Sequence, residues 1–64
     1  MKLKKLLKRV SDNAIVSLGI DGFCVCTLNA KDIPDSYEKF EVIHIWLGVT
    51  QCGTPKLNIE LKEN

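Results

Sequence analysis

The dipeptide Asp21-Gly22 narrows the possible folds of this chain most, because it stands between two apolar segments, residues 14–20 and 23–28. Both central residues of a type I′ turn have positive φ. Asp-Gly between two such segments is therefore among the strongest short-range signals for a two-residue β-hairpin. The turn predicts three cross-strand pairs on an apolar face: Ile20–Phe23, Leu18–Val25 and Val16–Thr27. The opposite face then carries the small residues Ser17, Gly19, Cys24 and Cys26.

A second hairpin is predicted in the C-terminal half. Residues 40–49 alternate, and residues 57–62 alternate after a turn over 51–55. Alternation of apolar and polar residues is typical of a half-buried strand. We expect one face of the first strand to point into the core, with Ile43, Ile45, Leu47 and Val49. The other face is expected to hold Val42, His44 and Trp46. With Leu47 opposite Leu57, His44 faces Glu60.

The first ten residues predict an amphipathic helix that ends near Val10. Their apolar residues follow the i, i+3, i+4, i+7 spacing of a core-facing stripe, namely Leu3, Leu6, Leu7 and Val10. Their charged residues are all basic: Lys2, Lys4, Lys5, Lys8 and Arg9. The remainder of the chain holds all eight acidic residues, so the net charge of +1 conceals a strong separation of charge.

These elements predict one small α+β domain over residues 1–64, because so short a chain forms a single domain. We expect an N-terminal amphipathic helix packed on a small antiparallel sheet of two β-hairpins, in the order α-β-β-short helix-β-β. The short helical turn is predicted over residues 35–40, where Asp35 followed by Glu38 resembles a capping box.

The three cysteines and the single histidine do not predict a metal site or a cofactor. Cys24 and Cys26 lie within a predicted strand at a spacing that zinc ligand pairs seldom use. No nucleophile, base and orienting group converge in the pattern, so we expect no enzymatic activity. No apolar segment is long enough to cross a membrane, and no signal peptide is recognisable. We therefore expect a cytoplasmic protein with reduced thiols.

Two binding surfaces are predicted. A strand that is apolar on both faces suggests an interface at Val42, His44 and Trp46, with a homodimer as the expected assembly. The basic surface of Lys2, Lys4, Lys5, Lys8 and Arg9 is the alternative, as a site for nucleic acid. It also admits a simpler interpretation as a solvated face that keeps the protein soluble.

A resemblance accompanies these patterns. The opening K-L-K-x-L-L-K-x-V-S-D-N, the hairpin, Lys31-Asp32-Ile33-Pro34 and Phe40-Glu41-Val42 resemble small uncharacterised proteins encoded by phages and mobile elements of low-GC Gram-positive bacteria. The resemblance implies an accessory protein of a mobile element that binds a host or phage macromolecule, and it carries over no catalytic residue.

Overall fold

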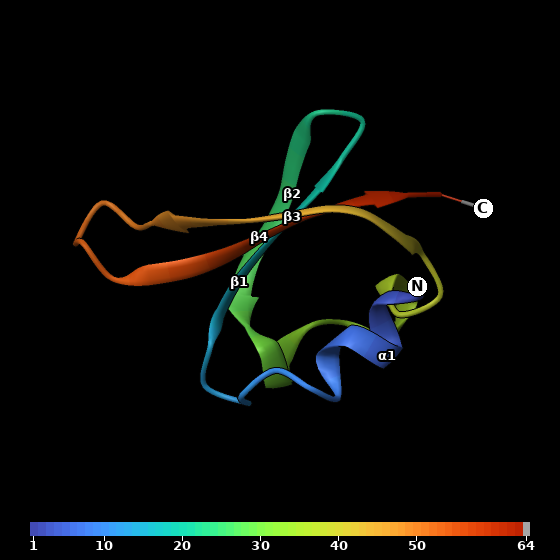
Figure 1. The fold of residues 1–64 in the computed structure, drawn as a ribbon, viewed down its shortest axis with the longest axis horizontal. Helices are drawn as coiled ribbons and strands as arrows, with labels where there is room; N and C mark the ends of the chain where they lie inside the picture. Colours follow the sequence, from blue (N-terminus) through green and yellow to red (C-terminus); the bar gives the residue numbers. More distant parts are fainter. Residues whose placement is uncertain (64) are drawn as a thin grey trace.

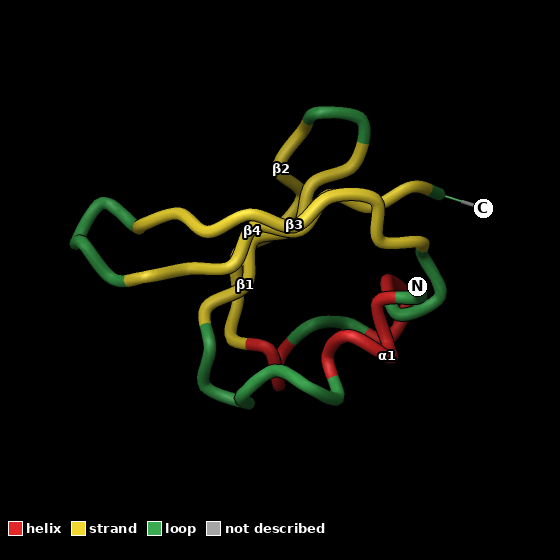
Figure 2. Tube along the Cα trace, viewed as in Figure 1, coloured by secondary structure: helices red, strands yellow, loops and turns green. Residues whose placement is uncertain are grey.

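The computed structural model describes residues 1–63, which form a four-stranded sheet with one short helix (Figures 1 and 2). The elements are α1 (Leu3–Leu7), β1 (Ile15–Ile20), β2 (Phe23–Asn29), the 3₁₀ turns η1 (Ala30–Asp32) and η2 (Asp35–Tyr37), β3 (Glu41–Val49) and β4 (Pro55–Lys62). The described part of the chain contains no helix that is long and apolar enough to cross a membrane.

The sheet is mixed, which corrects the expected antiparallel arrangement. Its strand order is β2-β1-β4-β3. The two predicted hairpins, β1–β2 and β3–β4, are confirmed as antiparallel pairs, but the central strands β1 and β4 pair in parallel. As a result β2 and β3 run in the same direction at opposite edges. A connection between strands of one direction must cross a face of the sheet, and residues 30–40 supply that crossing.

The Asp21-Gly22 turn is confirmed, with φ of 53° at Asp21 and 83° at Gly22. Ile20 pairs with Phe23 as predicted. The other two predicted pairs are wrong, because a bulge shifts the register between Leu18 and Gly19. Leu18 pairs with Cys26 and Val16 pairs with Leu28. The extra residue in β2 also moves Cys26 from the predicted small-residue face to the core face.

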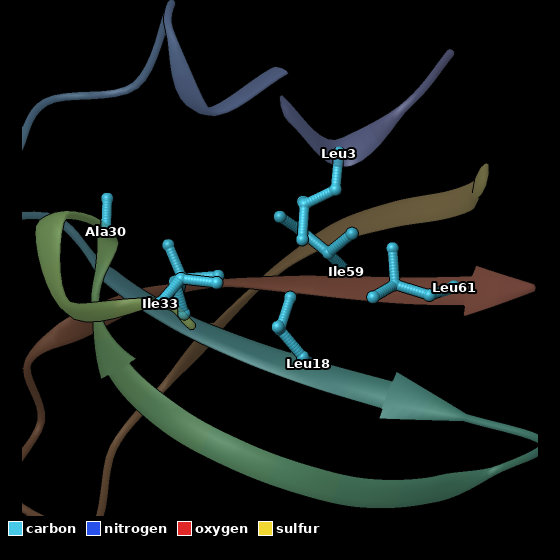
Figure 3. Packing of buried hydrophobic residues seen from close by; sticks show 7 residues of the cluster. Leu3, Leu18, Ala30, Ile33, Ile59 and Leu61 are labelled. Carbon is cyan, nitrogen blue, oxygen red and sulfur yellow. The ribbon is translucent and has the colours of Figure 1, made fainter. Parts of the chain in front are cut away.

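The core lies between one face of the sheet and the layer formed by α1, η1 and the loops (Figure 3). Its central strands contribute alternate residues that share a face, because Val16 pairs with Leu57, Leu18 with Ile59 and Ile20 with Leu61. The fully buried side chains are Leu3, Val16, Leu18, Ile59 and Leu61. Ala30 and Ile33 of the crossing connection complete the cluster.

The predicted ten-residue helix is wrong in length. α1 spans five residues, and the chain then tightens, since the Arg9 N–H donates to the Leu6 carbonyl at 2.9 Å and the Val10 N–H donates to the Leu7 carbonyl at 3.3 Å. Such i to i−3 bonds are typical of 3₁₀ geometry at a helix end. Leu3 is buried, whereas Leu6, Leu7 and Val10 are half-buried against the core. The predicted turn over 35–40 is confirmed as the shorter η2, which has no side-chain cap.

Candidate functional site

β3 forms one edge of the sheet, and only its first two residues are covered on the outer side. The Val42 N–H donates to the Met1 carbonyl at 2.8 Å, and Lys2 forms an isolated β-bridge with Glu41. Beyond this cover, no described residue pairs with residues 43–49 on the side of β3 that faces away from β4. We call residues 43–49 the free edge of β3.

The backbone at the free edge is oriented for pairing with another strand. The Thr50 N–H donates to the Thr54 carbonyl at 2.8 Å, across the turn toward β4. Since successive residues of a strand direct their backbone groups to opposite sides, the N–H and C=O groups of Ile45, Leu47 and Val49 point away from β4. An edge strand with such groups is a template for pairing with a further strand.

Large apolar side chains accompany these backbone groups. Leu47 is 81% exposed and Val49 is 65% exposed, and roughly half of Ile43, Ile45 and Trp46 is exposed as well. The prediction that Ile43, Ile45, Leu47 and Val49 point into the core is therefore wrong. The β3–β4 hairpin extends beyond the layer that covers the sheet (Figure 1). One signal in the sequence was available for this outcome. The apolar stripe of the N-terminal segment has only four residues, which are too few to cover one face of a four-stranded sheet.

The structure separates the three predicted interface residues. His44 pairs with Glu60 and Trp46 pairs with Asn58, so both lie on the face that no helix covers. Val42 pairs with Leu61 and packs against the core, because a bulge shifts the register between Val42 and His44. The prediction that Val42 shares a face with Trp46 is wrong for this reason.

The uncovered face of the sheet has a shallow hollow of about 210 Å³ beside Gly19. Trp46, Asn58, Glu60 and Cys24 are among its lining residues. At one side of it, Thr27 Oγ1 donates to Ser17 Oγ at 3.2 Å, and Ser17 Oγ lies 3.4 Å from Cys24 Sγ. The two hydroxyl groups and the thiol are thus hydrogen-bonded to one another. Among the described residues, no buried side-chain nitrogen or oxygen lacks a hydrogen-bond partner, in this hollow or elsewhere.

The environments of Cys24 and Cys26 affect their thiols in opposite ways. The hydrogen bonds from Ser17 and then Thr27 lower the pKa of the exposed Cys24 thiol. Burial raises the pKa of the half-buried Cys26 thiol. Cys52 is exposed in the turn between β3 and β4. Within residues 1–63, no three His, Cys, Asp or Glu side chains are grouped so that they could hold a metal ion.

The structure brings the predicted basic surface together. An open hollow of about 650 Å³ beside α1 is lined by Lys2, Lys4, Lys5, Lys8 and Arg9. Part of this charge is compensated, since Lys2 Nζ lies 3.5 Å from Glu41 Oε1. Lys4 and Lys8 also lie near Glu38 and lower its pKa, but a hydrogen bond with Asp35 has the larger effect and raises the pKa of Glu38 overall.

Comparison of the chain with protein-family models, with curated proteins and with solved structures gives no match.

Proposed function

We propose that this chain is a non-enzymatic interaction protein that binds a macromolecule through the free edge of β3. In line with the sequence resemblance, it would serve a phage or mobile element, and its partner would be a host or phage protein. The observation that carries the proposal is an unpaired edge with outward backbone groups and large exposed apolar side chains on both faces. Strand addition to a sheet edge is a common mode of protein recognition.

Apart from a bulge at its first residue, the free edge lacks the features that usually protect an edge strand. Natural edges are shielded by proline, by lysine, by inward-pointing charges or by a bulge in the strand. Residues 43–49 include no proline and no acidic or basic residue other than His44. The bulge of β3 lies at Ile43, where the free edge begins, and residues 44–49 pair with β4 without a further shift. An exposed apolar strand of this kind is costly in solution unless a partner covers it.

The arrangement of Cys24 and His44 favours a binding role over thiol-based catalysis. The two residues lie at opposite ends of one row across the uncovered face, in which Cys24 pairs with Gly19, Gly19 with Glu60 and Glu60 with His44. Three strand spacings separate them, which is roughly 14 Å. A nucleophile and its base need hydrogen-bond contact or one bridging water.

Capture with the immobilised protein tests this proposal. The variant Leu47→Lys places a charge on the free edge, and Phe23→Lys is its matched control, because Phe23 is 75% exposed on the opposite edge strand. We expect the wild type and Phe23→Lys to retain the same protein, either another copy or a protein of the host lysate, and Leu47→Lys to lose it. Equal retention by all three proteins would refute a binding role for the free edge.

The second candidate function is nucleic-acid binding through the basic surface, favoured by the convergence of five cationic side chains on one hollow. If these side chains contact five phosphates, the logarithm of the binding constant should fall against the logarithm of the salt concentration with a slope of about −4. The test is fluorescence anisotropy with mixed duplex and single-stranded DNA at low salt. Lys5→Glu/Arg9→Glu should abolish binding, while Lys62→Glu on β4 should retain most of it. Binding that is insensitive to the first pair would reject this candidate.

A further inference from the structure

We infer that the partner of the free edge is a second copy of this chain, paired antiparallel about a two-fold axis that lies between the two Trp46 residues. The inference rests on the proposed function and specifies its partner. The two four-stranded sheets then join through their β3 strands into one continuous eight-stranded sheet. Antiparallel pairing about a two-fold axis uses the same surface on both protomers.

β3 is the edge suited to this pairing, and β2 is not. β2 carries a bulge within its length, since Gly19 pairs with Cys24 whereas Leu18 pairs with Cys26. A bulge there leaves a residue unpaired, increases the local twist and interrupts the row of backbone groups. The bulge of β3 instead lies at Ile43, where the free edge begins, and the six residues from His44 to Val49 continue without a further register shift.

The midpoint of the free edge sets the register. Trp46 is the central residue of 43–49, and pairing centred there places residues 44–48 of one protomer opposite the same residues of the other. Ile45 then lies opposite the partner's Leu47, and both direct their backbone groups outward. Such a pair exchanges two hydrogen bonds. Trp46 lies opposite the partner's Trp46 as a non-hydrogen-bonded pair, in which the side chains approach most closely.

The same register matches the side chains on both faces. On the core side, Ile45 meets the partner's Leu47 and Ile43 meets the partner's Val49. On the uncovered side, the two Trp46 rings meet, and Gly48 faces the partner's His44. Pairs of aromatic and of aliphatic residues directly across two strands stabilise a sheet relative to alanine pairs. Every large apolar side chain of the free edge gains an apolar neighbour.

The distribution of charge also favours a second copy. The free edge contains no Asp, Glu, Lys or Arg, so pairing with a second copy places no two of these charged side chains opposite each other. The basic surfaces lie next to the beginning of each β3, because Lys2 bridges Glu41. In the antiparallel pair the two Glu41 residues are ten positions apart along the strands, which is about 33 Å. Salt screens such charges over about 8 Å at physiological ionic strength.

Sedimentation equilibrium of the 64-residue chain over a range from micromolar to millimolar concentration tests the dimer. The wild type and Phe23→Lys should form dimers, and Leu47→Lys and Trp46→Ser should remain monomers with the circular dichroism spectrum of the wild type. The dimer is refuted by a wild type that stays monomeric at the highest concentration. It is equally refuted if Phe23→Lys dissociates the dimer and Leu47→Lys does not.

Cysteine cross-linking tests the register. In a background with Cys24→Ser, Cys26→Ala and Cys52→Ser, a mixture of the Ile45→Cys and Leu47→Cys proteins should form an intermolecular disulfide rapidly under mild oxidation. Either protein alone should form it more slowly, since residue 45 then faces an unmodified residue. Fastest cross-linking of Ile45→Cys with itself would place the axis at Ile45 and overturn the assigned register.

Failure of the dimer and failure of the proposed function give different results. If the wild type is monomeric while a host protein is captured by the wild type and lost with Leu47→Lys, the free edge binds a different partner. In that case the self-pairing is wrong and the interaction function is retained. If Leu47→Lys changes neither self-association nor capture, both proposals are wrong.

Discussion

The amino group of Met1 lies 2.8 Å from Oε2 of Glu41, and this ion pair joins the first residue of the chain to the beginning of β3. The N-terminal ammonium, through this hydrogen bond, lowers the pKa of the Glu41 carboxyl, and Lys2 adds to the effect. The same contact positions the Met1 carbonyl to accept from Val42. The ion pair therefore helps to hold the cover that delimits the free edge.

Replacement of Glu41 by Gln should lower the melting temperature of the chain at neutral pH. A carboxyl whose pKa is depressed by folding stabilises the fold fully above its unfolded pKa, about 4.3, and loses that contribution as pH falls through the lower folded value. The difference in melting temperature between wild type and Glu41→Gln should thus be present at pH 7 and absent near pH 2. Thermal unfolding followed by circular dichroism at both pH values measures it. An equal difference at both pH values would contradict the ion-pair explanation.

Leu3→Ala should destabilise the fold strongly, although Leu3 belongs to a helix of only five residues. Its side chain is fully buried against the sheet, and truncation of a buried leucine costs about 2–5 kcal/mol. Urea denaturation of wild type and variant measures the change in the free energy of unfolding. Phe23→Ala, at a side chain that is 75% exposed, should change it by less than about 0.5 kcal/mol. Similar effects at both positions would show that Leu3 is not part of the core.

Gly22→Ala should destabilise the first hairpin. Gly22 has a φ of 83°, and a side chain in the left-handed region costs roughly 1–2 kcal/mol. Asp21→Asn is the matched control, because asparagine adopts positive φ readily and the type I′ turn accepts it. Chemical denaturation should separate the two variants by about 1 kcal/mol. Equal free energies of unfolding for Gly22→Ala and Asp21→Asn would show that the turn is of another type.

Cys24 should react with iodoacetamide faster than Cys26 at pH 7.5, because the thiolate is the reactive form and the two pKa values are shifted in opposite directions. Ser17→Ala should slow the reaction of Cys24 by raising its pKa toward the ordinary value, and Thr27→Ala should have a smaller effect. Mass spectrometry of peptides after timed alkylation gives the rates. Unchanged reactivity of Cys24 in Ser17→Ala would contradict a role for that hydrogen bond.

Much of the local structure could be predicted from residue patterns. The Asp21-Gly22 turn, the pairing of Ile20 with Phe23 and the position of His44 opposite Glu60 follow from turn chemistry and alternation. The two bulges could not be predicted in this way. Each adds one residue to a strand that still alternates in sequence, and each moves a side chain, Cys26 or Val42, to the opposite face.

The basic surface also follows from the sequence, because five cationic residues within eight positions of one segment remain neighbours in a short helix or in a looser turn. The free edge of β3 does not. Whether Ile45 and Leu47 are buried depends on how far the covering layer extends over the sheet. That extent is settled by contacts between distant segments, here the parallel pairing of β1 with β4 and the crossing of residues 30–40. Periodicity identifies which residues share a face of a strand, and only the packing of the whole chain decides what covers that face.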